Sequence, residues 1–375
     1  MLGQERLKKG TWMNNLPEDI IVEILLQLPV KPLLRFRCVS KRWFSLISDP
    51  HFAKSHFKRA SERTQRLLLS TSLRLGSLEV DKPFGNGSAV KKLNFPFKQR
   101  GRRVKILGSC NGLVCVSLYG HKDFYIWNPS TGDCRKLPDP AIAVHRKNIY
   151  IHGFGYDSST DDYKLLVGSY PLPRPSREAE GKLFSLKSNS WKTVANLFNP
   201  EEYCESAGIF SNGALHWQAE LIDPRIIAFD LAEEKFREVP MPDEYDDELN
   251  EELYFHTLKN LGGRLCFTCY RRTRVELLAM MEYGVLESWA IQFRVVRFDS
   301  GYDLTPLCFS KNNELLAMNS CGRELIRSTP QGEMGERFVV CSEPNGCHAA
   351  VYVESLLSPN RYHGDEGQHH HSFER

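Results

Sequence analysis

The feature that most constrains the fold is a turn signal that returns through most of the chain. Residues such as Asn, Asp and Gly tolerate positive φ and therefore suit tight hairpins. Each of these pairs precedes a short apolar run, so a hairpin is predicted at each of them. The second members step by 50, 51, 50 and 50 residues in the pairs Asn111-Gly112, Asp161-Asp162, Asn212-Gly213, Gly262-Gly263 and Asn312-Asn313.

A second hairpin is predicted within each unit, as in FYIWNPSTGDCRKLP and RIIAFDLAEEKFREVPMP. Two hairpins make four strands, and four strands in about 50 residues match a blade of a kelch-like propeller. Residues 66–359 hold about six such units, so we predict an all-β propeller with six blades. RLLLSTSLRL near residue 70 and AAVYVESLL near residue 352 are predicted to close the ring and remove its open sheet edges.

Aromatic residues recur in the second hairpins, at Trp127, Trp191, Phe236 and Trp289. Recurring side chains in a repeat protein usually pack each unit against the next. We therefore predict that these four residues pack blade against blade, with ligand contact as the alternative.

Residues 15–58 have a different pattern, which predicts four short helices. Pro17 and Pro32 can each open a helix, and Ser40 and Asp49-Pro50 can cap two more. A segment of about forty residues is too small to bury a core alone. We expect another polypeptide to complete this core, and the alternative is a helical subdomain that packs on the rest of this chain.

The order LP, then LPVKPLLRFRCVSKRW, then LISDPHF resembles the F-box. In that family the segment docks on a Skp-type adaptor, which joins it to the cullin and the RING subunit of a ubiquitin ligase. The resemblance implies, by motif position, a set of adaptor-facing or supporting residues: Leu16, Pro17, Ile20, Ile24, Leu28, Pro29, Leu33, Leu34, Val39, Trp43, Leu46 and Ile47.

The tract from ILGSCNGLVCV through IWNPSTGDCRKLP to GFGYDSSTDDYKLL is similar to the plant F-box-associated domain, commonly labelled kelch-like. It departs from true kelch blades, which carry a diglycine in each repeat, because only Gly262-Gly263 does so here. The two resemblances imply a small all-α F-box of short helices followed by an all-β, kelch-like propeller. The expected parts are a flexible N-terminus (1–14), the F-box (15–60), the propeller (66–359) and a disordered tail (360–375).

Charge and cysteine content exclude several classes of protein. Residues 1–60 hold 11 Lys and Arg against 5 Asp and Glu, whereas the whole chain carries a net charge of +3. Neither the charge of the first 60 residues nor that of the whole chain indicates a nucleic-acid partner, because the sequence has no nucleic-acid-binding motif beside it. Eleven scattered cysteines and a start without an apolar signal core predict cytoplasm and/or nucleus. No apolar window is long enough for a membrane span, so no membrane association is expected.

Three motifs have the spacing of a metal, redox or phosphate site but lack the rest of such a site. Cys266-Phe-Thr-Cys269 has redox or zinc spacing, but positions three apart in a strand face opposite sides. His369, His370 and His371 lie in a polar tail, and Gly153-Phe-Gly155 lacks the third glycine of a phosphate loop. We expect no cofactor, no metal and no catalytic residue.

Three loops are the candidate contacts with a protein substrate, because loops on a rigid scaffold can vary without disturbing it. The alternative is that they are solvated surface loops without a partner. They are the basic segment 91–105, the proline-rich segment 171–181 and the acidic run 243–252. The candidate residues are Phe95, Phe97, Arg100, Arg102, Arg103, Arg174, Asp246 and Asp247.

Together these parts predict the substrate-recognition subunit of an SCF-type (Skp–cullin–F-box) E3 ubiquitin ligase, which marks a protein substrate for proteasomal degradation. Such a subunit acts by proximity and needs no nucleophile of its own. One alternative is a propeller hydrolase with an unrelated helical interaction segment. Another is an F-box protein that sequesters its partner outside a ligase.

Overall fold

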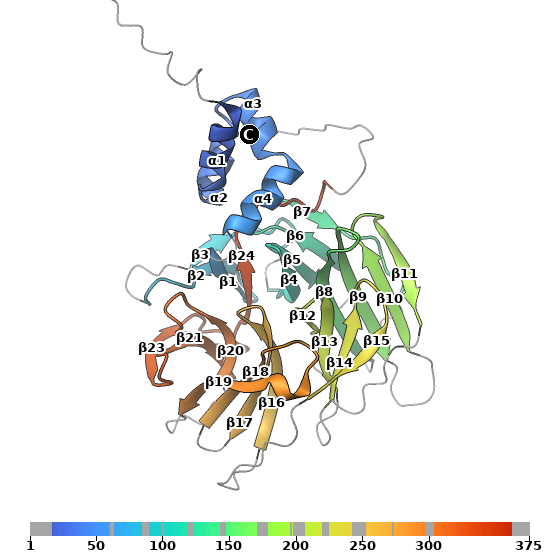
Figure 1. Ribbon diagram of the computed structural model, residues 1–375, viewed down its shortest axis with the longest axis vertical. Helices are drawn as coiled ribbons and strands as arrows, with labels where there is room; N and C mark the ends of the chain where they lie inside the picture. The colour runs from blue at the N-terminus through green and yellow to red at the C-terminus, as the bar shows by residue number, and fades with distance from the viewer. Residues whose placement is uncertain are drawn as a thin grey trace, which may run out of the picture.

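The computed structural model describes residues 17–60, 64–84, 90–99, 101–118, 123–142, 148–170, 179–195, 197, 207–219, 225–241, 253–271, 274–296 and 304–361. Within these ranges, four short helices precede six four-stranded antiparallel sheets. The sheets follow one another around a ring, and the helices stand at one side of it, with α4 nearest to β7 and β24 (Figure 1). The predicted fold of a helical segment and a six-bladed propeller is confirmed.

The helices are α1 (Glu18–Leu26), α2 (Val30–Phe36), α3 (Lys41–Ile47) and α4 (Pro50–Ala60). The predicted caps of the last two are confirmed. The Trp43 amide donates to Ser40 Oγ at 3.2 Å, and the Phe52 amide donates to Asp49 Oδ1 at 2.9 Å. Each cap satisfies a backbone donor that has no partner within its own helix.

The first two helices start differently from the prediction. Pro17 is the residue before α1, in an extended conformation with ψ 144°. Pro32 does not open α2, which begins at Val30 directly after Pro29. Pro32 is tolerated at the third helical position because the amides of the first turn have no intrahelical acceptor to lose.

The propeller strands run in chain order, with the last strand returning to the first blade. The first blade holds β1 (Gln65–Ser70), β2 (Leu75–Glu79), β3 (Lys91–Leu93) and β24 (His348–Val353), and the second holds β4 (Lys105–Cys110), β5 (Leu113–Leu118), β6 (Asp123–Trp127) and β7 (Cys134–Lys136). The third holds β8 (Ile149–Asp157), β9 (Asp162–Tyr170), β10 (Glu180–Ser185) and β11 (Ser190–Val194), and the fourth holds β12 (Ile209–Ser211), β13 (Ala214–Ala219), β14 (Arg225–Asp230) and β15 (Phe236–Val239). The fifth holds β16 (Leu253–Leu261), β17 (Arg264–Arg271), β18 (Arg274–Met280) and β19 (Trp289–Val296), and the sixth holds β20 (Leu304–Phe309), β21 (Leu315–Asn319), β22 (Glu324–Ser328) and β23 (Met334–Val339).

The predicted turn pairs join the two innermost strands of five blades. Positive φ is found at Asn111, Asp161, Asn212, Gly263 and Asn313, as tight hairpins of this kind require. The repeat in the sequence is therefore a repeat of hairpin turns.

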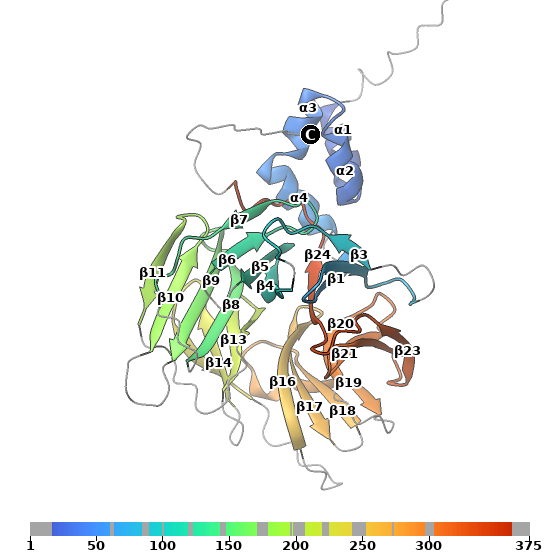
Figure 2. The same ribbon diagram turned by 180° about the vertical axis from the view of Figure 1, so that it is seen from behind.

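The ring is closed by strands from the two ends of the propeller. β24 pairs antiparallel with β1 in a register that runs from Gln65↔Val353 to Ser70↔His348, and Figure 2 shows the two strands side by side from behind. The predicted closing strands are confirmed. The first blade thus depends on contacts between residues almost 300 positions apart, and it leaves no open edge between the first and last blades.

Two of the recurring aromatic residues connect neighbouring blades through their indole groups. Trp191 Nε1 donates to the carbonyl of Pro138 at 2.7 Å, and Trp289 Nε1 donates to the carbonyl of Pro240 at 3.1 Å. Each proline follows the last strand of the preceding blade. The predicted role in packing blade against blade is confirmed for these two residues.

Trp127 is not equivalent to the other three, which corrects the predicted alignment of the blades. Trp127 lies on the third strand of the second blade, opposite Cys134 of the fourth strand. The residue in the same position of the third blade is Phe184, which lies opposite Trp191. Trp191, Phe236 and Trp289 all lie on fourth strands. Trp127 is fully buried and therefore has a core role in its own position.

Replacing Trp289 with phenylalanine tests the contribution of this connection. The variant keeps an aromatic ring but loses the donor to Pro240 and part of the buried area. We expect the free energy of unfolding to fall by about 1–2 kcal/mol in urea denaturation. An unchanged free energy of unfolding would show that the indole does not fasten the fourth and fifth blades together.

The propeller itself covers one side of the helical segment. Phe52 and Ala53 of α4 belong to the same buried apolar cluster as Leu356 and Leu357, which follow β24. Lys54 of α4 forms an ion pair with Asp161 in the turn between β8 and β9. The expectation that another polypeptide completes this whole core is therefore wrong for this side, because the chain's own β portion and C-terminal segment shelter it.

Candidate adaptor-binding and substrate-binding surfaces

Four large apolar side chains of the helical segment face solvent. Ile20 is 47% exposed, Ile24 50%, Val39 61% and Phe44 47%. Ile20 and Ile24 lie one turn apart on α1 and therefore share a face. Single exposed apolar residues are ordinary, but half of the large exposed apolar residues in the described chain fall in this segment, on α1, on α3 and, for Val39, in the turn between α2 and α3. We call these four residues the exposed apolar set.

Ion pairs hold the helices that carry this set. Arg42 Nη2 lies 3.0 Å from Glu18 Oε2 and joins α3 to α1. Arg59 makes two bonds to the Glu23 carboxylate, at 2.6 and 3.0 Å, and joins α4 to α1. Exposed pairs of this kind each contribute little to stability. Their use is to fix the orientation of α1, whose exposed face carries Ile20 and Ile24.

The predicted adaptor residues fall into three groups by exposure. The buried residues can support a binding surface but cannot reach a partner. The exposed residues are therefore the candidates for direct contact with an adaptor. Pro17, Ile20, Ile24, Pro29 and Val39 are exposed, Leu28, Leu34, Trp43 and Leu46 are half-buried, Leu33 and Ile47 are buried, and Leu16 lies outside the described residues.

Sequence reasoning missed Phe44 as a candidate contact. Trp43 and Ile47 lie on the inner side of α3, and Trp43 packs edge-on against Phe36 with ring centroids 5.4 Å apart. Phe44 follows Trp43 directly, so the helix turns it by about 100° away from that inner side. The position of Phe44, next to an inward-facing Trp43 on the same helix, is the sequence signal that could have identified it as exposed.

The second surface is the far face of the propeller, meaning the strand ends that point away from the helices. In β24, Val353 leads to Leu357 beneath α4, whereas His348 lies at the opposite end. The loop between β3 and β4, which carries the predicted basic contacts, lies at this opposite end because Leu93 pairs with Leu75 beside the turn at residues 71–74.

The basic side chains of this loop are fastened to neighbouring loops. Lys98 Nζ donates to the carbonyls of Thr71 at 3.2 Å and Ser72 at 2.8 Å. Arg103 Nη2 donates to the carbonyls of Asn345 at 2.9 Å and Gly346 at 2.5 Å. The loop is thereby bound to segments from both ends of the propeller and forms a firm part of the far face.

Phe95 is buried and is not a surface residue, which corrects its prediction as a substrate contact. Its exposed fraction is 3%, and its ring packs edge-on against Trp127 and Tyr125, with centroids 5.3 and 5.6 Å apart. The interleaved aromatic residue serves the core because the loop folds back over the second blade.

Of the other predicted substrate residues, three lie at the surface of the basic loop and four lie outside the described residues. Phe97 is 42% exposed and stacks on Tyr125 at 4.6 Å between centroids. Arg102 is exposed and Arg103 is half-buried. Arg100, Arg174, Asp246 and Asp247 lie outside the described residues.

Glu343 joins the two sides of the closure on the far face. Its carboxylate accepts hydrogen bonds from the backbone amides of Ser72 at 3.0 Å and Leu73 at 3.3 Å. Burial raises the pKa of Glu343, but hydrogen bonds from Ser72 and Thr71 to the charged form outweigh it and lower the pKa to about 2. The charged carboxylate therefore stabilises the folded state.

A pH series with Glu343→Gln tests this contribution. Because the folded pKa lies below the unfolded value of about 4.3, the stabilisation is complete above that pH and is lost as pH falls toward 2. We expect the variant to be less stable than the natural chain at pH 7. The difference in melting temperature should shrink steadily between about pH 5 and pH 3. A difference that stays constant with pH would contradict this role.

The other candidate sites have structural roles or lie outside the described residues. Cys266 and Cys269 belong to separate buried clusters on the two faces of β17, as the strand period predicts, and burial raises their pKa values to about 11 and about 12. Gly153 lies within β8, where a Cβ atom would come 2.9 Å from Leu215. Within the described part of the chain, no cluster of three or more His, Cys, Asp or Glu could hold a metal ion. The three tail histidines are not described.

No helix in the described ranges combines the length and the apolar character that a bilayer span requires.

A helical docking segment fixed to a six-bladed propeller defines a two-part interaction protein, and comparisons with known families agree. The model for the F-box domain matches residues 13–55, and the model for the F-box associated beta propeller domain matches residues 65–319. The chain belongs to the family of F-box proteins that carry this propeller. Members are typically non-catalytic adaptors, so the chain has a substrate-adaptor role in general, and its F-box implies a Skp-type adaptor as partner.

Similar proteins from Arabidopsis thaliana have the same extent. The F-box protein CPR1 is 30% identical over 92% of this chain and 89% of its own length. The F-box/kelch-repeat protein At3g23880 is 28% identical over 92% of this chain and 96% of its own. The F-box protein At4g22390 is 31% identical over 92% of this chain and 90% of its own length. The similarity therefore covers the helices and the propeller together.

Proposed function

We propose that this protein is the substrate-recognition subunit of an SCF-type E3 ubiquitin ligase. The helices dock on a Skp-type adaptor, which connects the chain to a cullin and a RING subunit, and the far face of the propeller binds the protein substrate. The substrate is ubiquitinated and degraded by the proteasome. The complex acts in the cytoplasm and/or the nucleus.

The observation that carries this proposal is the asymmetry of the helical segment. Its inner side is sealed against the propeller by Leu356 and Leu357, while Ile20 and Ile24 remain half exposed on its outer side. Burying such apolar side chains favours association by about 25 cal/mol for each Å² removed from water. An adaptor groove that covers α1 would supply this burial.

The attachment between the helices and the propeller supports the mechanism. Asn128, which is fully buried, donates from Nδ2 to the carbonyls of Ser355 at 3.0 Å and Leu357 at 2.7 Å. Arg135 donates to the carbonyl of Pro359 at 3.2 Å. A segment fixed in this way holds the propeller at a set position relative to α4. A bound substrate lysine is then kept near the ubiquitin-loaded enzyme, so that transfer becomes effectively intramolecular.

The proposal is tested by affinity capture from cells in which the proteasome is blocked. The natural chain is compared with a variant that carries Ile20→Asp and Ile24→Asp. We expect cullin and RING subunits to co-purify with the natural chain alone, and captured target proteins to carry ubiquitin with the natural chain alone. Targets captured equally by both chains, and unmodified in both, would instead indicate a sequestering role outside a ligase.

A further inference from the structure

The axis of the propeller holds a cavity of ≈ 440 Å³. It is lined by the innermost strand of every blade, β4, β8, β12, β16, β20 and β24, with further residues from the end of β21 and the turn after it. Its size lies in the range of small-molecule sites, which span about 300–1,000 Å³. It is therefore large enough for a compact organic ligand and too small for a folded partner.

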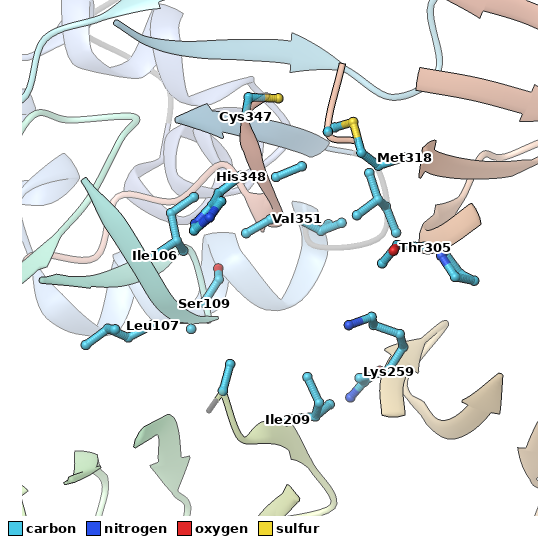
Figure 3. Close-up of a pocket in the computed structure, with 18 of the residues that line it drawn as sticks. Ile106, Leu107, Ser109, Ile209, Lys259, Thr305, Met318, Cys347, His348 and Val351 are labelled. Carbon is cyan, nitrogen blue, oxygen red and sulfur yellow. The ribbon is translucent and has the colours of Figure 1, made fainter. Parts of the chain in front are cut away.

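The walls of the cavity offer hydrogen-bonding groups as well as apolar surface. Each innermost strand is the edge strand of its sheet, and an edge strand carries backbone N–H and C=O groups outside the sheet's own pairing. Two of these carbonyls bond to the next blade, since His152 accepts from the Gly208 amide and Phe210 accepts from Asn260 Nδ2. Figure 3 shows Ser109, Lys259 and Thr305, from three different blades, arranged around the same space. Ile106, Ile209 and Val351 add apolar contacts between them.

The charge of the lining has one sign. Among the described lining residues there is no aspartate or glutamate, and Lys259 is the lysine that reaches the space. His348 lines the end toward the far face, where burial, followed by the charges of Arg103 and Lys105, lowers the pKa of its imidazole. The positive potential of these neighbours favours an anion, and a single lysine matches a single negative charge.

We propose that this axial cavity is a binding site for a small organic monocarboxylate with a flat or compact apolar body. The carboxylate pairs with the Lys259 ammonium and accepts from the Ser109 or Thr305 hydroxyl, while the body packs on Ile106, Ile209 and Val351. A ligand held there supports the inner ends of all six blades and lies beneath the far-face loops. The site goes beyond the ligase role and does not depend on it, because its lining shares no residue with the adaptor-facing helices.

Calorimetry on the full-length chain with sodium 2-naphthoate and its neutral analogue 2-naphthamide tests the site. We expect 2-naphthoate to bind saturably to one site and 2-naphthamide to bind at least about tenfold more weakly, because a charge-assisted hydrogen bond is lost. Lys259→Met should weaken 2-naphthoate by about tenfold and leave 2-naphthamide unchanged, while Lys259→Arg should stay within about threefold of the natural chain.

Lys92→Met is the matched control, because Lys92 is an exposed lysine on β3 and is not part of the cavity lining. It should bind both probes as the natural chain does. The comparison of the two probes on the natural chain needs no variant, so it holds even if a substitution impairs folding. Absence of saturable binding of 2-naphthoate, or equal binding of acid and amide, would overturn the proposal. Adaptor binding is measured separately and would be unaffected by either result.

Discussion

A chain that carries both Ile20→Asp and Ile24→Asp is expected to bind a Skp-type adaptor at least about a hundredfold more weakly than the natural chain. Each isoleucine offers a half-exposed aliphatic side chain to the interface, and burying it is favourable by about 1–2 kcal/mol. The introduced carboxylates add a desolvation cost if the interface still forms. Together these terms exceed about 3 kcal/mol, which is more than a hundredfold in Kd. Surface plasmon resonance with purified adaptor measures the change.

The matched control places the same substitution on exposed apolar residues of the propeller. Leu73 is 63% exposed and Met281 is 52% exposed, so Leu73→Asp with Met281→Asp alters similar surface outside the helices. This variant should bind the adaptor as the natural chain does. If the α1 variant melts normally and still binds with natural affinity, α1 is not the docking surface.

A chain that ends at Cys347 is expected to lose the stable propeller. It lacks β24, which supplies the whole inner strand of the first blade, and the segment that seals α4. Tyr352, Leu356 and Leu357 are all buried, and each contributes about 1.5–3 kcal/mol. Their sum is comparable with a typical total stability of about 5–15 kcal/mol. Circular dichroism should show no cooperative melting transition.

The control for this truncation is a chain that ends at Arg361, which keeps every described residue. It should melt within a few degrees of the full-length protein. A cooperative transition in the shorter chain, at the temperature of the longer one, would show that β24 does not close the ring.

The repeat was readable from the sequence because its physical cause is local. A tight turn between inner strands needs residues that accept positive φ, and Asn111, Asn212 and Asn313 have that conformation. The closing strands were also predictable. The sequence holds about six units, and the first blade has all four of its strands only if the apolar run near residue 352 pairs with the run near residue 70. Local turn chemistry therefore predicted the repeat, and counting the repeats predicted the long-range closure.

The exposed face of the helices was less predictable, because burial depends on contacts between distant residues. The motif placed Leu33 and Ile47 beside Ile20 and Ile24, yet the first two are fully buried and the last two half exposed. No local pattern indicates that Leu356 and Leu357 return from the far end of the chain to cover α4. Phe95 was misjudged for the same reason, since its core is built by Tyr125 and Trp127 of the next blade.

Amide hydrogen exchange of the protein, with and without a purified Skp-type adaptor, shows directly whether the helices are the docking surface. We expect adaptor binding to slow exchange in α1, α2 and α3 and to leave β1 to β24 unchanged. Slowing confined to the propeller strands, with the helices exchanging at their free rate in the complex, would contradict it.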